Sequence, residues 1–177
     1  MRREPEPPMS RRQALKHGAL VSGGYLSSYL LGGAAPAFGQ SPERDLTILN
    51  AALYLEHEAI AAYGAGAGSG LLSADVLKVA AAFMDDHQYH RDGIAGVIRT
   101  LGQTPAEAKP GYRFGRLRDA SDILKLALRL EQGAATAYRT LASSVQNKTV
   151  LNFAAHVLAD EVRHATVLRR VLDLRNY

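Results

Sequence analysis

The chain has 177 residues, contains no cysteine and carries a formal net charge of +4. Because cysteine is absent, disulfides and thiolate metal sites are excluded, and any metal must be bound by His, Asp or Glu. Most of the positive charge comes from the first 40 residues; without them, 21 basic and 17 acidic residues fall to 16 and 15, which leaves +1. Such a near-neutral body gives no basis for binding nucleic acid.

Residues 1–40 have the composition of an export signal. The segment "MSRRQALK" places Arg11 and Arg12 before a stretch rich in Leu, Gly and Ala, and its S-R-R-x-x-L-K pattern resembles a twin-arginine signal. Ala35-Pro36-Ala37 offers a cleavage site of the A-x-A type. We therefore expect cleavage near Ala37 and a periplasmic protein. The alternative is that the apolar stretch remains attached as a membrane anchor, which its glycines and serines disfavour.

From residue 41 onward, apolar residues recur at helical spacing. The segment "SPERD" offers an N-cap serine, a proline at the first helical position and acidic residues in the first turn, so it predicts a helix that runs to about Tyr63, before "GAGAGSG". Ser73 is the predicted N-cap of a second helix. This helix should reach Leu101, the last of its inward-facing residues, with Gly102 as its stop.

Residues 103–119 contain two prolines and two glycines and are expected to form a long connection. Two further helices are predicted, at about 119–144 and 147–174. Short first and third connections produce antiparallel helix pairs, and the longer middle link can cross the bundle. The predicted domain, residues 41–177, is therefore an all-α antiparallel four-helix bundle with a crossover between its second and third helices.

Each predicted helix has one inward row of residues at alternating spacings of three and four. These rows are apolar except near their middle, where the six ionisable residues are Glu56, His87, His90, Glu131, Glu161 and His164. Because the middles of antiparallel helices lie at one level, the six side chains should meet in the core. Three buried carboxylates without compensation would be costly, since each desolvated charge costs several kcal/mol. We therefore predict a metal site; the alternative is a buried hydrogen-bond network without metal.

The two halves of the domain repeat each other. "LEHEAIAAY" at 55–63 matches "LEQGAATAY" at 130–138, and each half supplies a glutamate and a histidine at similar separation. Two halves related by an approximate twofold axis predict a site for two metal ions. Tyr63 and Tyr138, two turns beyond the glutamates, either donate hydrogen bonds to the ligands or pack in the core.

On these motifs, the chain resembles a ferritin-like domain protein of the exported bacterial branch, over about residues 43–175. The resemblance implies that Glu56 and Glu131 are terminal carboxylate ligands, that His90 and His164 are terminal imidazole ligands, and that Glu161 bridges the two metals.

The sequence departs from this family pattern at His87, where a second bridging glutamate is expected. The adjacent Asp86 lies off the inward row, and either residue is a candidate for the vacant ligand position. With only three glutamates, the site supplies a charge of −3 against +4 for two divalent cations. We therefore expect the second metal to be held more weakly, on the side of the second helix.

We predict an exported protein that binds two iron or manganese ions. The resemblance implies redox chemistry with dioxygen or peroxide, like that of a ferroxidase, a peroxidase or a manganese catalase. The alternative is a non-catalytic binding or structural protein of the cell envelope, related to stress. The expected partners are metal ions and dioxygen or peroxide, with a homo-oligomer left open, no nucleic acid, and a membrane only if the signal is retained.

Three residues lie off the inward rows and are expected to be solvated or peripheral: His57, Glu58 and His156.

Overall fold

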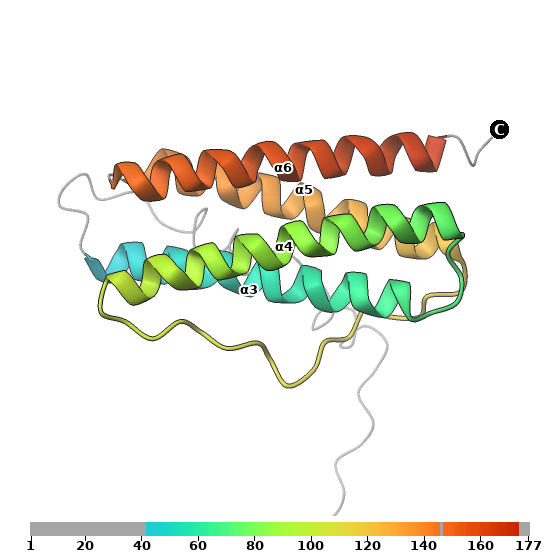
Figure 1. Ribbon diagram of the computed structural model, residues 1–177, viewed down its shortest axis with the longest axis horizontal. Coiled ribbons are helices and arrows are strands. Elements are labelled where there is room, and N and C mark those ends of the chain that lie inside the picture. Colours follow the sequence, from blue (N-terminus) through green and yellow to red (C-terminus); the bar gives the residue numbers. More distant parts are fainter. Residues whose placement is uncertain (1–41, 146, 174–177) are drawn as a thin grey trace, which may run out of the picture.

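The computed structural model describes residues 42–145 and 147–173 (Figure 1). Over these ranges the chain forms four α-helices and no strand, which confirms the predicted all-α class. The helices are α3 (Pro42–Ala67), α4 (Ala74–Thr100), α5 (Ala120–Ser144) and α6 (Lys148–Asp173). The predicted export signal and the Ser41 N-cap lie outside the described ranges.

The helices form a bundle of two antiparallel pairs. α3 packs beside α4 and α5 beside α6, and the pairs meet through α3 with α5 and through α4 with α6. As Figure 1 shows, α3 and α6 run in one direction and α4 and α5 in the other. The connection after α4 returns along the outside of α3 and α4 to the start of α5, so the predicted crossover is present.

The signals for helix ends act largely as predicted. Ser73 accepts a hydrogen bond from the backbone N–H of Val76, and Asp119 accepts one from the N–H of Asp122 at 2.8 Å. Each cap therefore satisfies an N–H group that has no partner within its helix. After α4, Gly102 takes a φ of +73°, a conformation that side chains with a Cβ rarely adopt.

Two predicted details were wrong. The first helix does not end at Tyr63 but continues through the following glycines to Ala67. Close packing of Gly66 against Ile123 of α5 accompanies these extra residues. Leu101 was expected to face inward, but it is 43% exposed because α4 ends one residue before it.

The apolar core consists of two clusters with the polar layer between them. The larger cluster includes Leu53 of α3 and Ile94 of α4, and the smaller one includes Phe83 of α4 and Leu168 of α6. On each helix, the ionisable residues lie between the residues that belong to one cluster and the residues that belong to the other. The helices therefore hold the polar side chains in the middle of the bundle, where apolar packing at both ends excludes water.

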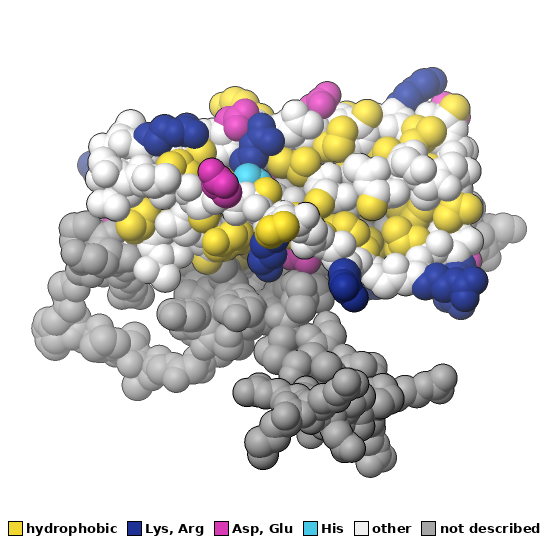
Figure 2. All heavy atoms as spheres, turned by 90° about the horizontal axis from the view of Figure 1, so that it is seen from below, with side chains coloured by type: hydrophobic (Ala, Val, Ile, Leu, Met, Phe, Trp, Pro, Cys, Tyr) yellow, Lys and Arg dark blue, Asp and Glu magenta, His cyan; other side chains and the backbone are white. Residues whose placement is uncertain are grey.

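The crossover is tied to α3 by hydrogen bonds. The N–H of Ala106 donates to Asn50 at 2.9 Å, and the carbonyl of Ala106 lies 3.2 Å from the His57 ring. Figure 2 shows the molecule from the crossover side, where apolar side chains are interspersed with charged ones over the coloured surface. None of the four described helices is both long and apolar enough to cross a membrane.

Candidate metal centre

The structure brings all six predicted ligands together in the core. Each is at most 1% exposed, and the six come from all four helices. They form two overlapping groups, in each of which one donor atom per residue lies within 4.8 Å of the others. The first group is Glu56, His87, His90 and Glu161; the second is His87, Glu131, Glu161 and His164.

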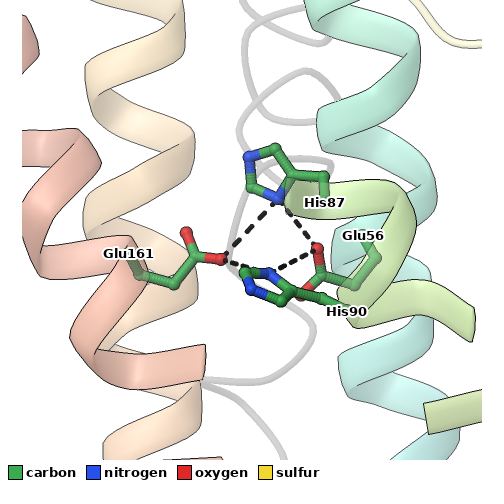
Figure 3. A group of neighbouring side chains, drawn as sticks. All are labelled: Glu56, His87, His90 and Glu161. Carbon is green, nitrogen blue, oxygen red and sulfur yellow. Dashed lines mark hydrogen bonds and ion pairs between the residues drawn. The ribbon is translucent and has the colours of Figure 1, made fainter. Parts of the chain in front are cut away.

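The first group encloses a point between α3, α4 and α6 (Figure 3). Nδ1 of His87 lies 2.8 Å from Oε2 of Glu56 and 3.6 Å from Oε1 of Glu161. Nδ1 of His90 lies 3.7 Å and 3.3 Å from the same two oxygens. A metal with ligand bonds of about 2.1 Å holds neighbouring donors about 3.0–3.4 Å apart, so these four atoms are close to coordinating positions.

The second group repeats this arrangement on the other half of the bundle. Oε1 of Glu131 lies 3.3 Å from Nε2 of His87, and Oε2 of Glu131 lies 3.3 Å from Nδ1 of His164. Glu161 completes the group. Each half thus contributes one glutamate and one histidine of its own, as the repeat predicted.

His87 and Glu161 belong to both groups and lie between the two halves. The His87 ring presents Nδ1 to the first group and Nε2 to the second, so it occupies the place where the family pattern has a carboxylate. Asp86, the other candidate for that place, is not part of either donor group. Its Oδ2 instead lies 3.0 Å from Nε2 of His164, on the outer side of that ring.

Each tyrosine of the repeat donates a hydrogen bond to the glutamate of the opposite half. The Tyr63 hydroxyl donates to Glu131, and the Tyr138 hydroxyl donates to Glu56. Of the two roles left open by the sequence, both tyrosines therefore take both: each donates to a candidate ligand, and each is buried in a core cluster. A bond of this kind fixes the orientation of a carboxylate before any metal binds.

A polar strap outside the ligands was missed at the level of sequence. Oδ2 of Asp160 lies 3.2 Å from Nε2 of His90, and Oδ2 of Asp86 lies 3.0 Å from Nε2 of His164. The Arg163 guanidinium joins the two aspartates, donating to Asp86 at 3.0 Å and to Asp160 at 2.8 Å. Both rings therefore have Nε2 engaged on the outside and Nδ1 facing the centre. The signal was an aspartate four residues before each histidine on the same helix, a spacing that places side chains on one face.

The three residues expected to lie off the site have different environments. His156 is exposed and His57 contacts the crossover, in agreement with the prediction. Of the two environments expected for Glu58, solvated or peripheral, it is not solvated: it is only 9% exposed, and burial raises the pKa of its carboxyl despite the nearby charge of Lys109. Glu58 nevertheless belongs to neither donor group.

Burial and mutual contact set the protonation of the metal-free cluster. Burial and the nearby Glu131 and Glu56 carboxylates raise the pKa of Glu161 well above its ordinary value. Burial would also raise the pKa of Glu56 and Glu131, but their contacts with the histidines outweigh it, and both pKa values are lowered. For His87, burial lowers the pKa, but hydrogen bonds to Glu131 and Glu56 outweigh it, so the ring favours its cationic form.

The donor set fits a metal ion. Three of its buried atoms have no hydrogen-bond partner, namely Nδ1 of His90 and both carboxylate oxygens of Glu161. An unsatisfied buried polar group costs about 1–3 kcal/mol, and a cation coordinated by these atoms would remove that cost. Mixed carboxylate and imidazole donors suit iron, manganese and zinc.

Comparisons with known proteins place this chain in a family. The family model described as a ferritin-like domain matches residues 44–174. The chain belongs to the ferritin-like domain family. No curated protein matched the chain. A crystal structure of a conserved hypothetical protein from Mycobacterium tuberculosis is 30% identical, with a TM-score of 0.68, and the match covers 73% of this chain and 90% of that one.

Two further structures are similar to this ferritin-like chain. A dodecameric thioferritin, the bacterioferritin-related protein of Bacteroides fragilis, is 25% identical with a TM-score of 0.67; the match covers 76% of this chain and 88% of that one. A ferritin-like, diiron-carboxylate protein from Bacillus anthracis is 23% identical with a TM-score of 0.67; the match covers 75% of this chain and 99% of that one. At that identity, the last match supports the ferritin-like fold alone.

Proposed function

We propose that this ferritin-like protein binds two iron or manganese ions and carries out redox chemistry with dioxygen or peroxide. The observation that carries the proposal is the set of three buried donor atoms on His90 and Glu161 that have no hydrogen-bond partner. Iron is the first candidate, because the similar structure from Bacillus anthracis is described as that of a ferritin-like, diiron-carboxylate protein. Manganese accepts the same donor types and is the second candidate.

Each residue has a defined place in this proposal. Glu56 and His90 would hold the first ion, Glu131 and His164 the second, and Glu161 and His87 lie between them. A bound pair of redox-active ions would supply electrons to dioxygen or peroxide. The chain itself orients the ligands: Tyr63 and Tyr138 hold the two terminal glutamates, and the strap of Asp86, Asp160 and Arg163 engages the outer nitrogen of each terminal histidine.

The decisive test is metal content followed by turnover. The full chain purified from its native compartment is measured by elemental analysis and then assayed with dioxygen and with peroxide. About two redox-active ions per chain with turnover would support the proposal. A folded, metal-free protein without turnover would refute it and favour a non-catalytic binding or structural role in the cell envelope. That role has a basis in His87, whose hydrogen bonds to Glu56 and Glu131 already satisfy part of the cluster without a metal.

We also propose that the protein is exported by the twin-arginine route and is periplasmic. The support is the sequence alone, namely Arg11 and Arg12 before the apolar stretch and the Ala35-Pro36-Ala37 site. Replacing both arginines with lysine should trap the protein in the cytoplasm, as measured by cell fractionation. Undiminished export of this variant would rule out that route.

A further inference from the structure

An apolar cavity of about 30 Å³ lies at the end of the bundle where α3 connects to α4. Its lining comes from all four helices and includes Ala80 of α4, Ala127 of α5 and Leu168 of α6. The smaller core cluster surrounds this space. The cavity therefore lies in the apolar end of the bundle next to the metal centre, on the side away from the larger cluster, and it is partly open to its surroundings.

The cavity and the metal centre share a wall. Tyr63 and Phe83 line the cavity, and their rings meet edge to face with centroids 6.2 Å apart. Tyr63 also donates its hydroxyl to Glu131, and Phe83 stacks on the His164 ring with centroids 3.9 Å apart. Both aromatic residues thus contact a residue of the second donor group on one side and the cavity on the other.

The lining selects the kind of molecule that can occupy this space. The lining side chains are aliphatic or aromatic apart from the hydroxyl of Tyr63, which is engaged by Glu131. A buried water needs two to four polar partners, and dry apolar cavities instead take up apolar molecules. Since one water-sized sphere needs about 10–15 Å³, the space suits a diatomic molecule. Peroxide, which donates and accepts hydrogen bonds, would lose those bonds here.

We propose that this cavity binds dioxygen beside the metal centre and that dioxygen, rather than peroxide, reaches the ions from this side. The delivery of dioxygen to the ions rests on the proposed redox function, but binding of dioxygen in the cavity can be tested without any redox-active metal. Tyr63 and Phe83 are the residues between the bound gas and the second donor group.

Occupancy is measured by NMR on the methyl-labelled full chain with zinc added, under several pressures of dioxygen and, as a reference, nitrogen. Zinc is redox-inert, so the paramagnetism of dioxygen itself is the probe. The methyls of Val76, Val79 and Leu168 should broaden more than those of Leu49 and Leu53 in the larger cluster. Equal broadening in the two clusters would overturn the proposal.

Matched variants test the position of the gas. Ala127→Val and Ala80→Val each add two methyl groups to the lining and should abolish the excess broadening. Ala134→Val is the control, since Ala134 lies seven residues further along α5 than Ala127 and is also buried but does not line the cavity. It should leave the excess broadening in place, and loss of the excess in this control as well would refute the assignment. Two filling variants on different helices guard against one that fails to fold.

A second measurement separates this inference from the proposed function. In the iron-loaded chain, Ala127→Val should slow oxidation of the ions by dioxygen severalfold at low dioxygen and leave oxidation by peroxide unchanged. Equal slowing with both oxidants, or no slowing, would overturn delivery through the cavity. If iron-loaded wild-type protein reacts with neither oxidant while the methyl broadening is present, the redox function fails and the dioxygen site stands.

Discussion

Tyr138 of α5 donates its hydroxyl to Glu56 of α3, and Tyr63 of α3 donates to Glu131 of α5. The two halves of the repeat therefore exchange their supporting hydrogen bonds across the core. A glutamate of one half is oriented correctly only when the other half is packed against it. The cluster of candidate metal ligands is thus a property of the whole bundle, and neither helix pair contains it alone.

The exchanged bonds can be tested by removing one hydroxyl. Tyr138→Phe leaves the ring in the core but frees Glu56 to reorient, so metal affinity should fall by about 10- to 100-fold. Tyr63→Phe should act in the same way through Glu131. Isothermal titration with the metal measures the effect. The control is Tyr54→Phe, because Tyr54 is 41% exposed and should not matter; equal affinity in all three variants would contradict a supporting role.

Metal binding should depend on whether a carboxylate belongs to a donor group, and not on whether it is buried. Glu131→Ala is expected to abolish most metal binding, because it removes a terminal carboxylate of the second group. Glu58→Ala removes a carboxylate that is also buried but belongs to neither group, so it should keep wild-type metal content. Elemental analysis after identical loading and dialysis compares the two. If both variants kept the same amount of metal, the assignment of the donors would be wrong.

His87 provides a test of charge. The three glutamates of the site supply −3, so the second divalent ion should be held weakly, and His87→Glu should raise occupancy towards two ions per chain. The control Gln88→Glu adds the same charge at the next position of α4, outside the donor groups, and should not change occupancy. Two firmly held ions in the wild-type protein, with no gain in His87→Glu, would show that another ligand supplies the missing charge.

The stability of the metal-free protein should fall as the pH rises above about 6.5, the ordinary pKa of histidine. The pKa values of His87 and His90 are raised on folding, so their stabilisation is present below that value and is lost as the pH rises through their folded values. The raised pKa of Glu161 acts in the same direction above about pH 4.3. The lowered pKa values of Glu56 and Glu131 stabilise above about pH 4.3, and this stabilisation is lost as the pH falls.

Urea unfolding between pH 5 and 9, with and without metal, measures this dependence. Bound metal replaces the protons of the cluster, so the loaded protein should lose less stability at high pH. Glu161→Gln removes one titrating group and should flatten the metal-free curve. Stability that rises from pH 6 to 9 without metal would contradict the protonation described above.

Close packing at the end of α3 makes a prediction about stability alone. A Cβ on Gly66 would lie 2.8 Å from Cγ2 of Ile123, a buried and stiff side chain, so Gly66→Ala should cost about 1–3 kcal/mol. A Cβ on Gly64, in the same helix, meets nothing within 4 Å. Gly64→Ala should therefore stabilise the helix by about 0.5–1 kcal/mol. Thermal unfolding of both variants gives the comparison; the same sign for both would refute the packing argument.

Helical periodicity, the caps and the position of ionisable residues on inward rows were enough to predict the four helices and to place six side chains in one buried layer. These features are local or depend only on antiparallel pairing, so they can be read along the chain. The end of α3 was missed because a glycine-rich segment has weak local preference, and contact with Ile123 of α5 decides its conformation.

Only the tertiary structure decided which atoms face each other. The sequence left Asp86 and His87 as rivals for one ligand position; packing of α4 against α6 turns Asp86 towards the outer nitrogen of His164 and places His87 between the two halves. The hydrogen bonds that each tyrosine donates to the glutamate of the other half likewise depend on how the two helix pairs are rotated against each other. Spacing along one helix determines which face a residue occupies, whereas the partner of that face is determined by the other three helices.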